Sequence, residues 1–326
     1  MGPQNAQLDL GSTLRTLSGK TILVTGAGGF IGSAITDLLA SFSAKVRALL
    51  GAPGERVWEP CQPVERCRAD IRDLVKLCEF AKGADIVVHA AGPPSVRSSF
   101  EFPADYASIH TVGTVTLMEA CRRSGVRRVV YLSSAEVYGC PSTNPVEENH
   151  PVRPLSPYGA AKAAAEIFVR TMTNASKIEH AILRPFSVFG PRQSPDSLIA
   201  TILRQAKREG CVWLNDLRPV RDYCYVQDLV EAIALACTVN GEGCVFNIGS
   251  GEGTSVEEIA KLILRLRQTD IPVRQKPHSE RPPDAEIYRL VADARKAKAV
   301  LGWEPRTSLA DGLMETIAWM KRSGDI

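Results

Sequence analysis

The fold of this chain is decided by the stretch Thr21-Ile22-Leu23-Val24-Thr25-Gly26-Ala27-Gly28-Gly29-Phe30-Ile31-Gly32. Its first residues suit a buried strand, the glycine run suits a tight turn, and the apolar residues from Ile31 to Ala40 predict a helix. Gly26 permits the turn, Gly29 lets a pyrophosphate approach the backbone, and Gly32 lets the helix pack closely. The helix N-terminus, at Phe30 and Ile31, offers unpaired amides to phosphates. The G-x-x-G-x-x-G spacing therefore predicts a dinucleotide site.

Composition and charge limit the partners that this chain can have. The 326 residues are 44% hydrophobic, enough for a large core in one large domain or two smaller ones. Lys and Arg number 39 against 36 Asp and Glu, without a basic tract, so we expect neither nucleic acid nor an anionic membrane as partner. No apolar run reaches about 18 residues, which argues against a membrane span. The expected partner is a small molecule.

The cysteines and the first residues bear on location. The 9 cysteines form no C-x-x-C pair and lack the histidine spacing of a zinc site, so we expect reduced thiols, no metal and a cytoplasmic protein. Residues 1–19 lack the hydrophobic segment of a signal peptide and contain Gln, Asn, Ser and Gly. We therefore expect a flexible leader there.

Strand and helix patterns alternate along the first half of the chain. Predicted strands end near Thr25, Leu50, Asp73, Gly92 and Ser133, with helical patterns between them. This order predicts an α/β fold with a doubly wound parallel sheet, a Rossmann fold, and ligands at the strand carboxyl ends. We expect residues 20–187 to form the dinucleotide-binding domain, with 221–250 returning to it. Residues 188–220 and 251–322 are expected to form a smaller C-terminal α/β substrate-binding domain.

Further residues suit the cofactor. Asp70 is placed to accept a hydrogen bond from the adenine amino group and Ile71 to pack on its ring, while the small Ala90 and Ala91 allow a cofactor to lie close above the sheet. Leu50 stands where an Asp would bind both ribose hydroxyls, and Gly51 stands where an Arg would hold a 2′-phosphate. The choice between NAD and NADP stays open on these residues, and we favour NAD.

A catalytic group is predicted after the fifth strand. Tyr158 and Lys162 are four residues apart and share one face of the predicted helix. A lysine ammonium beside a phenol lowers the tyrosine pKa from its usual value of about 10, which makes the tyrosine a general base. Ser134, at the strand end, is placed to bind the same substrate oxygen. Arg192, Arg221 and Arg281 are candidates to neutralise a substrate diphosphate.

Together these motifs resemble an extended short-chain dehydrogenase/reductase of the NAD-dependent epimerase/dehydratase family, over residues 20 to 320. The resemblance rests on the glycine turn, Asp70-Ile71, the Ser134 segment, Tyr158 with Lys162, and further matches: Leu183-Arg184-Pro185, Gly190-Pro191-Arg192-Gln193, Arg221-Asp222-Tyr223, Asn247-Ile248-Gly249 and Leu301-Gly302-Trp303-Glu304-Pro305. UDP-sugar 4-epimerases are the most similar members.

The resemblance implies roles for particular residues. It makes Ser134, Tyr158 and Lys162 the catalytic triad. The implied cofactor-binding residues are Gly26, Gly29, Phe30, Ile31, Gly32, Asp70, Ile71, Ala90, Ala91, Tyr158, Lys162 and Pro185. The implied substrate-binding residues are Ser134, Glu136, Ser187, Arg192, Arg221, Arg281 and Asp284. Relatives form homodimers through helices that correspond to residues 102–124 and 156–174.

Four positions depart from the family pattern. Leu50 replaces the ribose-binding acid, and His110 and Ser187 each stand where an Asn is usual. Ala135 matters most, because dehydratases carry an Asp and a Glu after the catalytic hydroxyl residue and only Glu136 is present here. We therefore expect an NAD-dependent UDP-sugar 4-epimerase, an isomerase of carbohydrate metabolism. The alternatives are a dehydratase, C5 epimerase or decarboxylase that uses Glu136 as base, and a non-catalytic dinucleotide-binding protein.

Overall fold

Short apolar segments build one parallel sheet in the computed structural model, which describes residues 10–51, 58–208, 210–239, 244–277 and 286–326. The sheet has 7 strands in the order β10-β6-β5-β4-β1-β2-β3, and all neighbours are parallel. The strands are β1 (Thr21–Thr25), β2 (Lys45–Leu50), β3 (Glu65–Arg68), β4 (Ile86–His89), β5 (Arg128–Leu132), β6 (Glu179–Pro185) and β10 (Cys244–Ile248). The order reverses at β1, where such sheets bind ligands beyond the strand carboxyl ends. The predicted doubly wound fold is confirmed.

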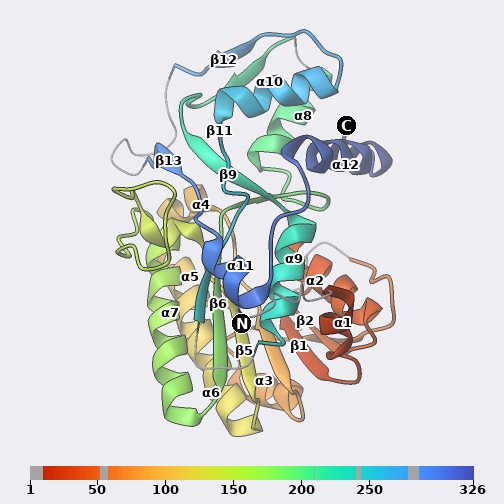
Figure 1. Ribbon diagram of the computed structural model, residues 1–326, viewed down its shortest axis with the longest axis vertical. Helices are drawn as coiled ribbons and strands as arrows, with labels where there is room; N and C mark the ends of the chain where they lie inside the picture. Colours follow the sequence, from red (N-terminus) through yellow and green to blue (C-terminus); the bar gives the residue numbers. More distant parts are fainter. Residues whose placement is uncertain (1–9, 52–57, 209, 240–243, 278–285) are drawn as a thin grey trace, which may run out of the picture.

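Helices cover both faces of this sheet, because its strands are apolar on both sides. Ile22 and Val24 belong to one apolar cluster, whereas Leu23 between them belongs to the other. The first cluster includes α2 (Phe30–Ser41) and α9 (Val226–Ala236), and the second includes α3 (Leu74–Ala81), α6 (Gly113–Ser124) and α7 (Pro157–Ser176). Figure 1 shows the helices of each cluster beside the sheet.

Several short helical segments lie near the carboxyl ends of the strands. They are α4 (Val96–Glu101), α5 (Pro103–Ala107), the π-helix η1 (Ser108–Val112) and the 3-10 helix η2 (Ala135–Tyr138). In η1 the Gly113 amide donates to the Ser108 carbonyl, five residues back, so one extra residue is accommodated before α6. Within the described residues, no helix is long and apolar enough to cross a bilayer.

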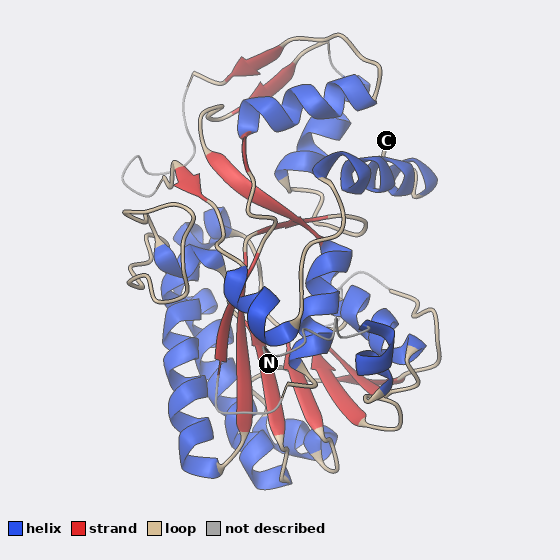
Figure 2. Cartoon of the chain, in the orientation of Figure 1, coloured by secondary structure: helices blue, strands red, loops and turns tan. Residues whose placement is uncertain are grey.

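A smaller lobe lies beyond the carboxyl ends of the large sheet (Figure 2). Its strands are β7 (Ser187–Phe189), β9 (Val220–Tyr225), β11 (Gly253–Ser255) and β13 (Arg289–Leu290), with a separate pair formed by β8 (Val212–Leu214) and β12 (Val273–Gln275). Its helices α8 (Leu198–Arg208), α10 (Val256–Leu266) and α12 (Leu309–Arg322) share a third apolar cluster with these strands.

Some segments belong to a different lobe from the one that the sequence predicted. Residues 221–250 were expected to return to the large sheet, but β9 pairs with β7, β11 and β13, and only α9 and β10 return. Conversely, α11 (Arg295–Leu301) lies within 251–322 yet packs on β10 and α9, because Ala297, Leu301 and Trp303 join the first apolar cluster. The side chain of Asp222 connects segments at which the chain passes between the two lobes.

The Asp222 carboxylate accepts hydrogen bonds from the Ser250 amide (2.6 Å), the Ser250 hydroxyl (2.7 Å), the Gly251 amide (2.9 Å) and the Ala292 amide (3.1 Å). Burial raises the pKa of this carboxyl, and the hydrogen bonds oppose that shift. One buried side chain of β9 therefore fixes the segments that follow β10 and β13.

The expected flexible leader is wrong for residues 10–19. Residues Leu10–Arg15 form α1, which packs on α9. Leu14 is 1% exposed and Leu17 is 2% exposed, both within the first apolar cluster. Composition alone suggested a flexible leader, but Leu14 of α1 and Leu17 just after it supply enough apolar surface to hold this segment against the body.

Replacing Leu14 by Ala should lower the free energy of unfolding by about 2–5 kcal/mol, because the change leaves a cavity in a packed core. Urea denaturation followed by circular dichroism measures this. Ser18→Ala, at an exposed position nearby, is the control and should stay within about 0.5 kcal/mol of wild type. A Leu14→Ala effect as small as that of the control would show that this segment does not contribute to the fold.

Candidate active site

The glycine turn has the geometry that a dinucleotide requires. Gly26 has φ +68°, and a Cβ there would lie 2.7 Å from the Ala91 Cα, so only glycine fits. A Cβ on Gly32 would lie 1.9 Å from the Gly26 carbonyl oxygen, so Gly32 lets the helix pack on the turn itself. A Cβ on Gly29 would meet only the Gly26 oxygen, at 3.2 Å. The backbone at Gly29 is therefore open to a ligand.

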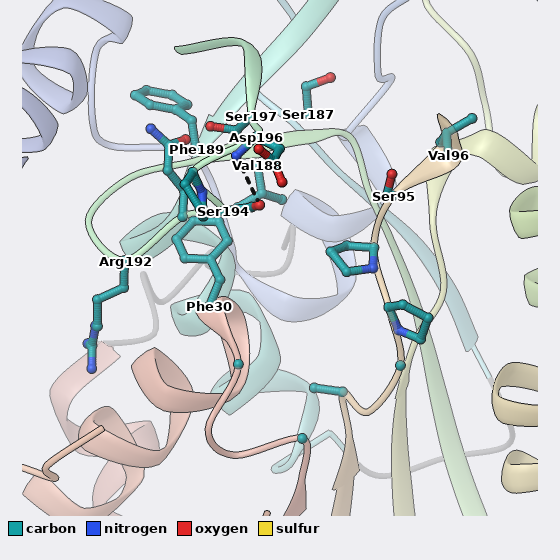
Figure 3. A pocket seen from close by; sticks show the side chains of 18 of the residues that line it. Phe30, Ser95, Val96, Ser187, Val188, Phe189, Arg192, Ser194, Asp196 and Ser197 are labelled. Carbon is teal, nitrogen blue, oxygen red and sulfur yellow. Dashed lines mark hydrogen bonds between the residues drawn. The ribbon is translucent and has the colours of Figure 1, made fainter. Parts of the chain in front are cut away.

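The first turn of α2 is free to bind an anion. Gly29 is its N-cap, no side chain caps it, and no acid lies in its first turn. Its amides therefore suit a pyrophosphate. This turn lines a cleft of about 1800 Å³. Figure 3 shows Phe30 on one side of the cleft and Ser95 and Val96 on the other.

Most residues assigned to the cofactor line this cleft or the cavity beside it. Asp70, Ile71, Ala90 and Ala91 line the cleft, and Ile31 and Pro185 line the adjoining cavity. The Asp70 carboxylate already binds the Arg72 guanidinium at 2.5 Å, and this hydrogen bond lowers the Asp70 pKa. Its role towards adenine stays a prediction. The residues present fit a dinucleotide.

The adjoining cavity, of about 280 Å³, brings the predicted catalytic groups together. Its lining includes Ser134, Glu136, Tyr158, Lys162 and Ser187. Ser134 caps η2, and Ser156 and Pro157 begin α7, which places Tyr158 in its first turn. Ser134 lies close enough to Tyr158 to lower the pKa of the tyrosine. The segment after β5 and the first turn of α7 therefore meet at this cavity.

The prediction that Lys162 lowers the pKa of Tyr158 is wrong for the protein by itself. Burial raises the Tyr158 pKa above its usual value, and the nearby Ser134 hydroxyl opposes this only in part. Burial also lowers the Lys162 pKa to about 7, while Glu166 raises it. The Lys162 Nζ donates to the Leu132 carbonyl at 2.7 Å and lies 6.0 Å from the centre of the Tyr158 ring. Desolvation disfavours both the Tyr158 phenolate and the Lys162 ammonium. The spacing of the two residues in the sequence does not reveal this burial.

A buried ion pair that the sequence analysis did not assign lies beneath this cavity. The Glu166 carboxylate accepts from Arg184 Nε (2.8 Å), Arg184 Nη2 (2.7 Å) and the Ser133 hydroxyl (2.6 Å). Arg184 also donates to the Tyr138 hydroxyl (2.8 Å), which donates to Asn247 (2.7 Å). The available signal was an arginine inside the apolar strand 179–185, with Glu166 one helical turn beyond Lys162.

His110, which replaces the usual Asn, also lines the catalytic cavity. Its ring centre lies 5.3 Å from that of Tyr158, and its Nε2 lies 3.0 Å from the Pro93 carbonyl oxygen. Burial and the nearby Lys162 lower the His110 pKa to about 3, so the ring is neutral at physiological pH. A Cβ on Gly92 would lie 2.2 Å from this ring, so the bulkier side chain requires glycine there.

The predicted substrate-binding residues do not lie together. Arg221 lines the cleft and pairs with Glu286 at 3.0 Å, whereas Arg192 turns to Asp37 of α2 at 2.9 Å. Arg281 and Asp284 lie outside the described residues. Tyr223, which is 8% exposed, and Gln193, which is 5% exposed, also line the cleft. Within the described part of the chain, the Tyr223 hydroxyl and the Gln193 Nε2 have no hydrogen-bond partner. Both suit a polar ligand.

Lys162 should make stability depend on pH. Between its folded pKa of about 7 and its ordinary value of 10.5, the unfolded chain holds a proton that the folded chain has released. The free energy of unfolding of wild type should therefore rise with pH in this window, relative to Lys162→Met. Denaturant titrations at several pH values measure the difference. Lys76→Met, which removes an exposed lysine of α3, is the control, and an equal pH trend in both variants would contradict the burial argument.

Comparisons with known proteins agree with this geometry. A putative UDP-glucose 4-epimerase of Methanocaldococcus jannaschii is 35% identical over 309 residues, which cover 93% of this chain and 99% of the relative. Among solved structures, MoeE5 in complex with UDP-glucose and NAD is 34% identical with a TM-score of 0.85, covering 93% of this chain and 99% of that one. The Thermotoga maritima UDP-glucose 4-epimerase with UDP-glucose is 30% identical with a TM-score of 0.87 and the same coverage. Residues 22–249 match the model of the NAD dependent epimerase/dehydratase family, and the chain belongs to this family.

Proposed function

We propose that this chain is an NAD-dependent UDP-sugar 4-epimerase. One observation carries the proposal: Ser134, Tyr158 and Lys162 line a single cavity that opens beside the glycine turn of the dinucleotide cleft. The relatives described above are named or solved as UDP-glucose 4-epimerases, or bind UDP-glucose with NAD. A protein that only bound a dinucleotide would gain nothing from a buried lysine that costs stability.

The proposed chemistry begins at the sugar C4 hydroxyl. Tyr158 takes its proton as general base, and Ser134, which lines the same cavity, orients the same oxygen. The Lys162 ammonium, held by the Leu132 carbonyl, favours the phenolate when it is charged. When bound, NAD would supply the acceptor for the C4 hydride and would return it to the opposite face of C4 after the 4-keto sugar has turned in the cavity. Tyr158 then gives the proton back to the product oxygen, so no net oxidation results.

The remaining residues divide between cofactor and substrate. We assign the large lobe to NAD and the smaller lobe to the nucleoside diphosphate, with Arg221 opposite the phosphates and Ser187 near the sugar. Tyr223 and Gln193 supply a donor hydroxyl and a donor amide on the same cleft wall. Asp70, Ile71, Ala90 and Ala91 face the nucleotide half of NAD.

One observation favours a second candidate function. Glu136 lines the catalytic cavity, where a carboxylate could remove a proton from C5 and so give a dehydratase, C5 epimerase or decarboxylase. Ala135 supplies no acid for a leaving hydroxyl, which weighs against dehydration. The two functions differ in whether a carbon-bound hydrogen exchanges with water.

Turnover of UDP-glucose in D2O separates them. In 4-epimerisation the C4 hydrogen travels as hydride and never meets solvent, so mass spectrometry should find no carbon-bound deuterium in the UDP-galactose formed. Tyr158→Phe is the blank, and it should lose at least about a hundredfold in rate, the contribution usual for a general base. Deuterium on C5 or C6 that disappears in Glu136→Gln would replace the epimerase by the second function.

We also infer that two copies of the chain pair through exposed apolar side chains on one side of the large lobe. Val112 of η1 and Ile167 and Phe168 of α7 are large and exposed. A second copy that packed against these helices would cover the exposed side chains in a two-fold interface.

A cytoplasmic location is supported by the 9 cysteines, all of which are free thiols.

Sedimentation velocity tests the homodimer. Wild type should sediment as a dimer at micromolar concentration, and Phe168→Glu should shift it to monomer because the interface would bury an unpaired charge. Val75→Glu, an equally drastic change at an exposed apolar side chain of α3, is the control and should leave the dimer intact. A monomeric wild type, or a dimer that survives Phe168→Glu, would contradict this interface.

A further inference from the structure

The segment between β7 and α8 runs along the wall of the dinucleotide cleft. Phe189, Pro191 to Leu198 and the glycine turn residues Gly26, Gly28 and Gly29 all line this cleft. Arg192 stands in this segment with φ +72°, a left-handed conformation that costs free energy in a residue other than glycine. The next residue, Gln193, is buried, whereas the Arg192 side chain is 31% exposed. Figure 3 shows the Arg192 side chain extending away from Ser194, Asp196 and Ser197.

Arg192 reaches a carboxylate of the large lobe. Its Nη1 donates to Asp37 Oδ2 at 2.9 Å, and the Asp37 side chain is 15% exposed. The same carboxylate accepts from the Cys61 amide at 3.1 Å and from Trp58 Nε1 at 3.4 Å. Asp37 therefore connects three separate parts of the chain: its own helix α2, residues 58–61 and the segment after β7.

These three parts surround one end of the cleft. Leu50, Gly51 and Trp58 line the cleft beside Asp37 and Arg192. Because this end follows β2, it is the end where a Rossmann fold receives the adenosine ribose. Leu50 and Gly51 present no charged side chain to a ribose, so cofactor affinity at this end must come from elsewhere in the wall.

We propose that the ion pair of Arg192 with Asp37 is a clasp that retains NAD by joining the smaller lobe to α2 across the adenosine end of the cleft. Arg192 is then a positioning residue for the cofactor and does not neutralise the substrate diphosphate. The strained backbone at Arg192 is explained by the contact that it permits. The proposal rests on NAD in the cleft and holds for the 4-epimerase and for the second candidate function alike.

The test measures release of radiolabelled NAD from the loaded protein after dilution into excess unlabelled NAD. Arg192→Gln and Asp37→Asn should each release NAD about tenfold faster, equivalent to about 1.4 kcal/mol. The double variant should release it no faster than either single variant, because both changes remove one interaction. Arg295→Gln, which removes a different exposed arginine with carboxylate partners, is the control and should release NAD at the wild-type rate.

Arg192→Gly separates the clasp from a role in folding. Glycine accepts the left-handed conformation without strain, so this variant should fold, as thermal unfolding would show, and should release NAD as fast as Arg192→Gln. Unchanged release in the single variants, or additive effects in the double variant, would overturn the clasp. Weaker UDP binding with unchanged NAD release would also overturn it and would return Arg192 to the substrate diphosphate.

Discussion

Glu166 and Arg184 form their ion pair where both side chains are almost fully removed from water. Two charges in such a place are costly unless every remaining hydrogen-bonding group finds a partner. Here Ser133 and Arg170 complete the carboxylate, and Tyr138 and the Glu148 carbonyl complete the guanidinium. Because those partners belong to α7, η2, the residue that follows β5 and the segment before α7, the pair requires all of these parts to assemble in one arrangement.

Two of the proposed catalytic residues and one proposed cofactor-binding residue lie near this pair in the chain. Ser134 follows Ser133, and Lys162 lies one helical turn before Glu166 on α7. Pro185 follows Arg184 at the end of β6. The buried ion pair thus helps to position the cavity that Ser134, Tyr158 and Lys162 line. Fixed geometry of this kind is what general base catalysis needs.

Local rules were sufficient where a short pattern had one physical meaning. The run Thr21 to Gly32 contains its own strand, turn and helix signals, and Tyr158 with Lys162 needed only helical spacing to share a face. Properties set by residues distant in the chain were not predictable. Burial of Lys162 depends on packing from several strands, the partner of Arg192 lies 155 positions away, and α1 is held by α9 from the other half of the chain. For the same reason the lobe boundaries were wrong at β9 and α11.

The extra residue in η1 lies within one continuous helical stretch that runs from α5 to α6. The side chains before it and after it therefore face different directions. Each residue of an α-helix advances the side-chain direction by about 100°, so the insertion rotates everything before it relative to α6. Tyr106 can therefore meet Tyr158 edge-on at 6.2 Å while Leu117 and Met118 pack beneath the sheet. Loss of a single residue between positions 108 and 112 would restore a regular helix and turn Tyr106 away from Tyr158. In this part of the molecule, the local residue count has as much influence on the active centre as residue identity.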